Sequence, residues 1–241
     1  MKTIIPKLLS ILFIATLFSA CNANMFNGVS GNRNVRTENR SVQENFTSVK
    51  VSTGLELYVT KGVKPKITVE ADENLQNIII TEVKNGVLNI YSEKNIWKAA
   101  ARKVYVTAKT LEGITATSGA EVYTQETIAV NTIDINASSG AQIEISLDAN
   151  SVETNATSGA HIYVIGLTEN HTSSATSGAS IDAYKLRSKQ VTVNVTSGAD
   201  INIYASESIN ATATSGGDID FKGSPKKINK TKNSGGSISA K

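Results

Sequence analysis

A short phrase, Ser-Gly-Ala or Ser-Gly-Gly, recurs seven times between residues 117 and 238 and constrains the fold more than any other feature of the chain. The steps between its glycines are 21, 19, 19, 20, 18 and 19 residues. The glycines are Gly119, Gly140, Gly159, Gly178, Gly198, Gly216 and Gly235. Self-similarity at a near-constant period is the signature of a repeat architecture.

Apolar residues alternate with polar ones on both sides of each glycine. The third residue after it is always Val or Ile, and the third before it is Ala or Val in all but the last repeat. This period of two predicts two short strands and a corner in every repeat. A repeat of this length has no room for a crossover helix. We therefore predict an all-β parallel solenoid of seven rungs, with strands pairing at roughly 4.8 Å with those above and below.

The residues at the corner fit this arrangement. The glycine can adopt backbone conformations that a Cβ would resist. The serines before it, and the Thr or Ser residues before those, would stack into ladders whose hydroxyls bond to one another or to backbone. A ligand surface is the other interpretation of these ladders, but corner formation explains them better, because equivalent serines in every rung do not single out a nucleophile.

The first twenty residues resemble a lipoprotein signal peptide. Lys2 and Lys7 precede an apolar run that ends in Phe18-Ser19-Ala20-Cys21, and this run is too short for a membrane span. The sequence before Cys21 resembles a bacterial lipobox, although Phe18 replaces the usual Leu. The resemblance implies that Cys21 carries a lipid anchor in the membrane. An ordinary secreted protein is the alternative, but Cys21 has no other cysteine with which to pair.

Charge is small overall and uneven along the chain. Removal of residues 1–20 would lower the formal charge from +3 to +1, which gives no electrostatic reason to expect nucleic-acid binding. Residues 111–221 hold 3 Lys+Arg against 13 Asp+Glu, and residues 222–241 hold 6 against none. The acidic segment could attract cations or basic partners, but solvated outward faces explain it better.

Three further segments complete the predicted organisation. Residues 21–40 are polar and aperiodic and predict a flexible tether. Residues 41–110 show the alternation without the glycine phrase, and Asn85-Gly86 predicts a hairpin, so we expect a β-sheet unit that caps the first rung. Residues 111–241 form the solenoid, and its Lys-rich end either covers or trails from the last rung. Short helices are candidates at 72–76 and 95–101.

The first functional hypothesis is a non-catalytic binding module. Residues two and four positions after each glycine vary, as outward positions of a solenoid can. The candidate ligand surface consists of Tyr123, Tyr163, Tyr184, Tyr204, Asp200, Asp218 and Asp220. Exposed tyrosines can stack on sugars or contact protein. The alternative is that each tyrosine packs along a neighbouring rung.

The second hypothesis is a β-helix polysaccharide lyase or hydrolase, which would use carboxylates. Asp200 and Asp218 occupy equivalent sites on adjacent rungs, with Asp220 nearby, but the register places no Lys or Arg beside them. The only two histidines, His161 and His171, fall at different repeat positions and are expected on the surface. A calcium ladder does not fit, although one site near Asp218 stays open; we predict no zinc and no cofactor.

The combined motifs resemble the family described as putative auto-transporter adhesin, head GIN domain. The resemblance covers roughly residues 40–235 and rests on the lipobox, residues 49–59 with Gly54, residues 68–75, the turn at 86–88 and the Ser-Gly-Ala ladder. It implies a right-handed parallel β-helix in a cell-envelope or outer-membrane lipoprotein, surface-exposed or periplasmic. Together with the binding-module hypothesis, it favours an adhesin that presents its solenoid faces to a glycan or protein ligand. The triplet behind the family name corresponds here to Gly54-Leu55-Glu56.

Overall fold

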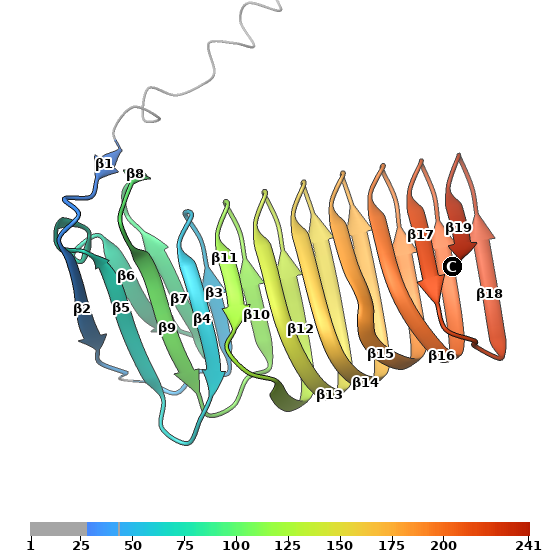
Figure 1. Cartoon of the computed structure of the whole chain (residues 1–241), viewed down its shortest axis with the longest axis horizontal. Helices are drawn as coiled ribbons and strands as arrows, with labels where there is room; N and C mark the ends of the chain where they lie inside the picture. Colours follow the sequence, from blue (N-terminus) through green and yellow to red (C-terminus); the bar gives the residue numbers. More distant parts are fainter. Residues whose placement is uncertain (1–27, 43) are drawn as a thin grey trace, which may run out of the picture.

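The computed structural model describes residues 28–42 and 44–241, and they form one long stack of strands (Figure 1). Tight corners line one edge of the stack and wider bends line the other. The strands that run between these two edges form the two sides of the stack, one before each corner and one after it. The described residues contain no helix long and apolar enough to cross a bilayer. The predicted signal peptide and Cys21 lie outside the described residues.

The solenoid predicted from the repeat is confirmed. Its strands are β10 (Gly113–Ala116), β11 (Glu121–Thr124), β12 (Ile128–Ala137), β13 (Gln142–Thr157), β14 (His161–Thr176), β15 (Ser180–Val195), β16 (Asp200–Ala213), β17 (Asp218–Lys222), β18 (Lys227–Lys232) and β19 (Ser237–Ala240). Strands β13 to β16 continue through the bend and serve both sides. All these pairings are parallel, and equivalent residues face one another, as Ile143, Ile162 and Ile181 do.

The Ser-Gly corners are type I′ turns linked by backbone hydrogen bonds. In the first, Ser118 has φ 55° and Gly119 has φ 68°, and the Ala120 N–H donates to the Thr117 carbonyl at 3.2 Å. Positive φ at both central residues defines this turn type. The Gly119 N–H then donates to the Ser139 carbonyl of the next rung at 3.1 Å, and the same bond recurs at every later corner but the last. The corners therefore continue the backbone ladder from rung to rung.

An additional corner lies before the first Ser-Gly phrase. Thr53 and Gly54 have φ 58° and 67°, and the Gly54 N–H donates to the Ser118 carbonyl at 3.0 Å. The flanking strands β3 (Ser48–Val51) and β4 (Glu56–Lys61) pair in parallel with β10 and β11. Thr53-Gly54 is thus a corner of the same stack with Thr in place of Ser.

The rest of residues 41–110 caps this end of the stack, as predicted. β7 (Val87–Ser92) and β9 (Arg102–Ala108) pair in parallel with β3 and β4. β6 (Ile79–Lys84) forms the predicted hairpin with β7, and β5 (Lys66–Asp72) pairs antiparallel with β9. The 72–76 helix is a single 3-10 turn at Glu73–Leu75, whereas 95–101 contains the strand β8 (Ile96–Lys98).

The prediction of a flexible tether over residues 21–40 is wrong for residues 28–40, and residues 21–27 lie outside the described residues. Val35–Arg40 forms β2, which pairs antiparallel with β5, and Val29–Ser30 forms β1, which pairs with β8. Buried Asp72 binds this segment, because its carboxylate accepts the N–H groups of Arg33 at 2.8 Å and of Ala100 and Ala101 at 3.0 Å. Burial opposes ionisation of Asp72, but these bonds hold its pKa below the ordinary value.

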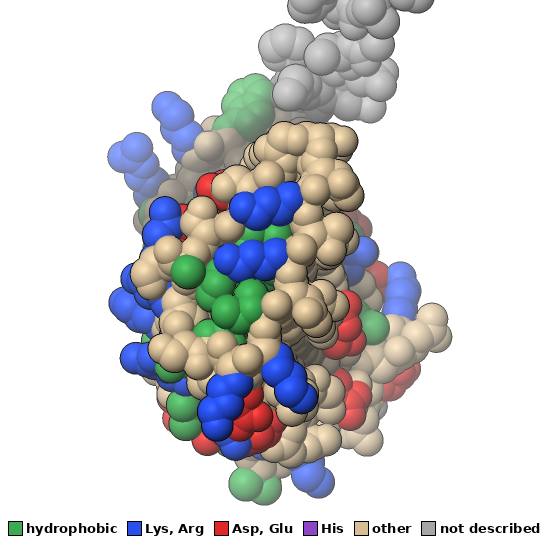
Figure 2. Space-filling model, turned by 90° about the vertical axis from the view of Figure 1, so that its right-hand side faces the viewer, with side chains coloured by type: hydrophobic (Ala, Val, Ile, Leu, Met, Phe, Trp, Pro, Cys, Tyr) green, Lys and Arg blue, Asp and Glu red, His purple; other side chains and the backbone are tan. Residues whose placement is uncertain are grey.

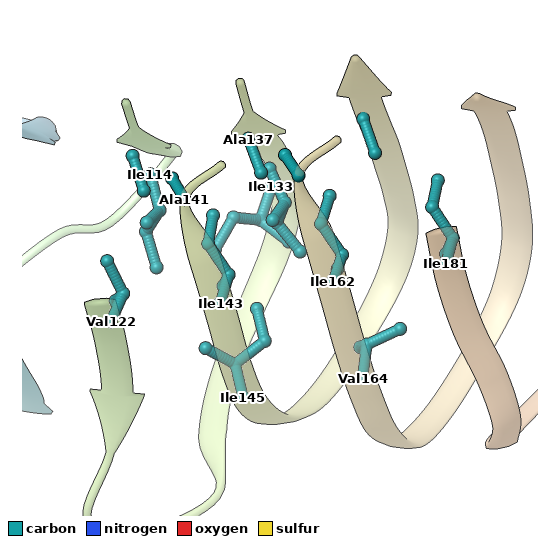
Figure 3. Close-up of a cluster of buried hydrophobic side chains, with 14 of the residues drawn as sticks. Ile114, Val122, Ile133, Ala137, Ala141, Ile143, Ile145, Ile162, Val164 and Ile181 are labelled. Atoms are coloured by element: carbon teal, nitrogen blue, oxygen red, sulfur yellow. The ribbon is translucent and has the colours of Figure 1, made fainter. Parts of the chain in front are cut away.

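The core is a set of apolar columns between the two sides. Figure 3 shows Ile143, Ile162 and Ile181 in successive rungs, with Ile133 and Ala137 reaching the same interior from the other side. Each rung adds the same few aliphatic side chains, and its neighbours cover them. No rung could bury these side chains alone, so the stack is cooperative along its length.

His171 corrects the expectation of two surface histidines. Its side chain is 1 % exposed and occupies a core column between Val152 and Val191. Nε2 lies 3.0 Å from Thr154 Oγ1, and Nδ1 is buried without a hydrogen-bond partner. Burial lowers the pKa of His171 to about 3. The position seven residues before each corner glycine has the same parity as the buried positions three and five before it, so the alternation could have identified His171 as a core residue.

Lysines occupy core columns at the C-terminal end. In β18, Lys230 pairs with Ala211 and Lys232 with Ala213, and Lys230 Nζ lies 4.7 Å from the centre of the Phe221 ring. Figure 2 faces this end and shows Lys or Arg side chains lying across an apolar patch. The Lys-rich segment is therefore the last rung itself, and inward-facing charges hinder the docking of a further rung.

We expect the corner glycines to be required for their conformation and not for space. A Cβ at Gly159 would meet no atom within 4 Å, yet its φ is 68°. Gly159→Ala should therefore destabilise the protein by about 1–2 kcal/mol, measured by urea denaturation. Ser158→Asn should stabilise it by up to about 1 kcal/mol, since Asn tolerates this region better. Glu153→Ala, on an exposed strand position, is the control; equal effects of Gly159→Ala and Glu153→Ala would contradict this account.

His171 should make the fold acid-sensitive. Its folded pKa is depressed, so the unfolded state takes up a proton first as pH falls below about 6.5. The native state should then lose up to about 1.4 kcal/mol per pH unit until pH approaches 3. His171→Val should remove this part of the pH dependence of the unfolding free energy. His161→Gln, on the outer face, should retain it, and the same slope in both variants would exclude His171 as the cause.

Lys230 and Lys232 should keep the stack from growing end to end. We expect Lys230→Val together with Lys232→Val to move the protein to larger species in size-exclusion chromatography with light scattering, because the last rung would then resemble an interior one. Lys226→Ser, outside β18, should not do so. An unchanged mass for the double variant would show that the lysines have no such role.

Candidate functional site

The candidate ligand residues lie on the outer surface of the sheet formed by the strands that follow the corners. We call this surface the tyrosine face. One of its columns runs Tyr105, Tyr58, Tyr123, Glu144, Tyr163, Asp182, Asn202, Asp220 and Ser239. The adjacent column runs Lys103, Glu56, Glu121, Gln142, His161, Ser180, Asp200, Asp218 and Ser237. These positions vary in chemistry while the inward columns remain aliphatic.

Tyr123 belongs to a stack of three rings. The ring centres of Tyr58 and Tyr105 are 5.1 Å apart, and those of Tyr58 and Tyr123 are 5.4 Å apart. The Tyr123 hydroxyl donates to Glu121 at 2.7 Å; burial, followed by this carboxylate, raises the pKa of Tyr123. Since Tyr58 has a ring on each side, these tyrosines pack along neighbouring rungs, which is the alternative interpretation of the sequence.

The other three candidate tyrosines carry cations on their rings. Lys185 Nζ lies 5.6 Å from the Tyr163 ring centre, the Arg187 guanidinium 4.3 Å from that of Tyr204, and Lys222 Nζ 4.1 Å from that of Tyr184. Such contacts stabilise by about 0.5–1 kcal/mol each at exposed sites. Each pair joins two different rungs, so the cations and rings interleave.

A bulge in β15 produces this arrangement. Ala183 pairs with Ile203 and Ser188 with Ala205, so the four residues from Tyr184 to Arg187 lie opposite the single residue Tyr204. The Asp182 carboxylate supports the bulge by accepting the Tyr184 N–H at 3.1 Å. The sequence carries the signal, because a 20-residue repeat from Gly178 to Gly198 is followed by one of 18.

The bulge borders a shallow depression of about 500 Å³, which we call the bulge pocket. It is lined by Tyr163, Asp182, Tyr184, Lys185, Arg187, Tyr204, Lys222 and Lys241. Another depression, of about 530 Å³, lies by the β6–β7 hairpin. Its lining includes Lys50 and Lys84, and Lys84 is paired with Glu82 at 2.7 Å, so it holds fewer cations than the bulge pocket and only one of the seven tyrosines, Tyr91. The bulge pocket combines three of the predicted tyrosines with four cations and is the stronger candidate.

The aspartates divide into two groups. Asp200 and Asp218 pair on adjacent rungs, as expected, but both are exposed and lie outside the bulge pocket. Asp220 forms an ion pair with Lys241 at 3.1 Å. The expectation that no Lys or Arg lies beside this cluster is therefore wrong, because the chain terminus returns to it.

His161, Ser180 and Asp200 occupy successive rungs of one column, a set of residue types used in nucleophilic catalysis. The order is unsuitable, since the serine lies between the other two and its hydroxyl donates to Asp200 at 2.5 Å. A triad instead requires the histidine to accept the serine proton. Among the residues that the structure describes, no group of three or more His, Cys, Asp or Glu side chains could hold a metal ion.

Comparison with known proteins places the chain in a family. The model of the family described as putative auto-transporter adhesin, head GIN domain, matches residues 45–225. No curated protein matches the sequence.

Solved structures share the fold. A putative adhesin from Bacteroides fragilis aligns with a TM-score of 0.83 at 22% identity, covering 89% of this chain and 100% of that one. A putative lipid binding protein from Parabacteroides distasonis gives 0.72 at 20% identity, with 88% and 99% covered. A putative adhesin from Parabacteroides merdae gives 0.72 at 18%, with 89% and 99% covered. Since the family model spans most of the chain, the protein belongs to the putative auto-transporter adhesin, head GIN domain family.

Proposed function

We propose that this protein is a non-catalytic, lipid-anchored adhesin of the bacterial cell envelope that binds a glycan or protein ligand on its tyrosine face. The supporting observation is a rigid ladder of backbone and aliphatic columns whose outward columns vary freely. Such a surface can be changed for recognition without loss of the fold. Family membership supports a location outside the cytoplasm.

Adhesion, rather than degradation of a polysaccharide, fits the geometry better. A glycosidase needs two carboxyl groups that flank one bond in a defined site. Asp200 and Asp218 instead lie exposed side by side on the open sheet. The Asp200 carboxylate accepts a hydrogen bond from the Ser180 hydroxyl. The bulge pocket is lined by cations and tyrosines with one carboxylate, Asp182, and no histidine.

The proposal is tested with cells that produce the protein and cells that lack it. We expect the protein in the membrane fraction, accessible to protease added outside, and released to the soluble fraction by Cys21→Ser, because the lipid anchor would be lost. The soluble chain should bind a defined subset of a glycan and host-matrix array. An array without any bound ligand, together with unchanged adherence of deleted cells, would contradict the adhesin function.

A further inference from the structure

The cations of residues 111–221 are gathered at one place. Residues 111–221 contain only three Lys or Arg residues, Lys185, Arg187 and Lys189, and all lie in or directly after the β15 bulge. Two rungs further along, Lys222 reaches back over the Tyr184 ring, and the chain ends with Lys241 beside the same pocket. A cationic patch therefore interrupts the part of the tyrosine face from β11 onward, whose other outward residues in the two columns are acidic or neutral.

Most of this positive charge is not neutralised within the protein. In the described part of the chain, Lys185, Arg187 and Lys222 form no ion pair with a carboxylate within 4.0 Å, whereas Lys189 pairs with Glu169 at 2.7 Å and Lys241 with Asp220 at 3.1 Å. Asp182 lies in the pocket, but its carboxylate is engaged by the Tyr184 N–H. The rings beneath the cations orient them without cancelling their charge.

The shape of the pocket limits the ligand. The cations belong to rungs from β15 to the chain terminus, so they span roughly 15 Å at the ordinary spacing of strands. A ligand that contacts them all must carry negative groups at intervals along its length. The lining contains no Val, Leu or Ile side chain; its apolar surface consists of tyrosine rings and the alkyl parts of Lys and Arg, which do not form an enclosed apolar site for an acyl chain. Tyrosine rings and hydroxyls instead suit the C–H and O–H groups of a sugar.

We infer that the bulge pocket is a binding site for an acidic polysaccharide, one with carboxylate or sulfate groups on successive sugars. Arg187 would bind one anionic group in bidentate fashion. Lys185 and Lys222 would bind others as point charges, and Tyr163 and Tyr204 would contact the rings between them. This inference rests on the proposed function and specifies its ligand class.

Calorimetry tests the inference by measuring the binding of two acidic polymers, polygalacturonate and chondroitin sulfate, to the protein. Dextran is the neutral control polymer. We expect both anionic polymers to bind, more weakly as NaCl is raised, and dextran not to bind. Lys185→Gln with Arg187→Gln should weaken binding about tenfold or more. Lys189→Gln, which removes a neighbouring cation that is paired outside the pocket, is the matched control and should change it less than about twofold. Thermal unfolding of each variant verifies the fold.

Several results would overturn the inference. Equal loss in Lys189→Gln and in the double variant would indicate nonspecific charge attraction. Dextran binding as tight as that of the acidic polymers would remove the role of the cations. Binding to phosphatidylglycerol vesicles but not to either polymer would assign the patch to a membrane surface. If no acidic polymer binds while the array returns another ligand, this inference fails and the adhesin function stands; if the array is also empty, both fail.

Discussion

The hydrogen bond from every corner glycine N–H but the last to the serine carbonyl of the next rung is the constraint on which the rest depends. It exists only because both turn residues adopt positive φ, which costs a non-glycine residue about 1–2 kcal/mol. In return, the peptide groups at the tightest point of the coil are satisfied by the neighbouring rung. A corner in another conformation would interrupt the ladder on both of its sides, so two residues with positive φ, the second of them glycine, must recur with every rung; Thr53-Gly54 meets this requirement without serine.

That constraint leaves the outward columns free. The corner uses backbone atoms, and the core uses aliphatic side chains that face inward, so neither depends on the residues of the tyrosine face. The two ends of this face show the consequence. Tyr105, Tyr58 and Tyr123 stack on one another and contribute packing, with Lys103 5.9 Å from the Tyr58 ring centre. Tyr163, Tyr184 and Tyr204 instead each carry a cation on the ring. The same residue type thus serves structure at one end and a candidate site at the other.

The repeated part of the molecule is predicted well, because the same corner motif occurs there seven times. Prediction from the sequence fails where a structural feature occurs only once or is formed by other residue types. Thr53-Gly54 forms the same corner without the serine, and Val35–Arg40 is a strand although its outer position leaves no apolar alternation. The apolar–polar alternation places His171 at an inward-facing position, but histidine is uncommon in a hydrophobic core, so the residue type points to the surface. The candidate tyrosines could be named from sequence, but their division into a stack and a pocket depends on ring contacts that no periodicity encodes.

The bulge pocket illustrates why a departure from the period is informative. A solenoid with rungs of equal length presents a flat face, and a flat face gives a ligand few converging contacts. Placing a 20-residue rung before an 18-residue one shifts the register between β15 and β16, and the cations of the bulge then reach rings on both neighbouring rungs. Acidic residues on neighbouring rungs, such as Glu121, Glu144 and Asp200, add to the selectivity, because they disfavour binding of an anionic chain beside the bulge. The irregular rung and the uneven charge are therefore two parts of one arrangement.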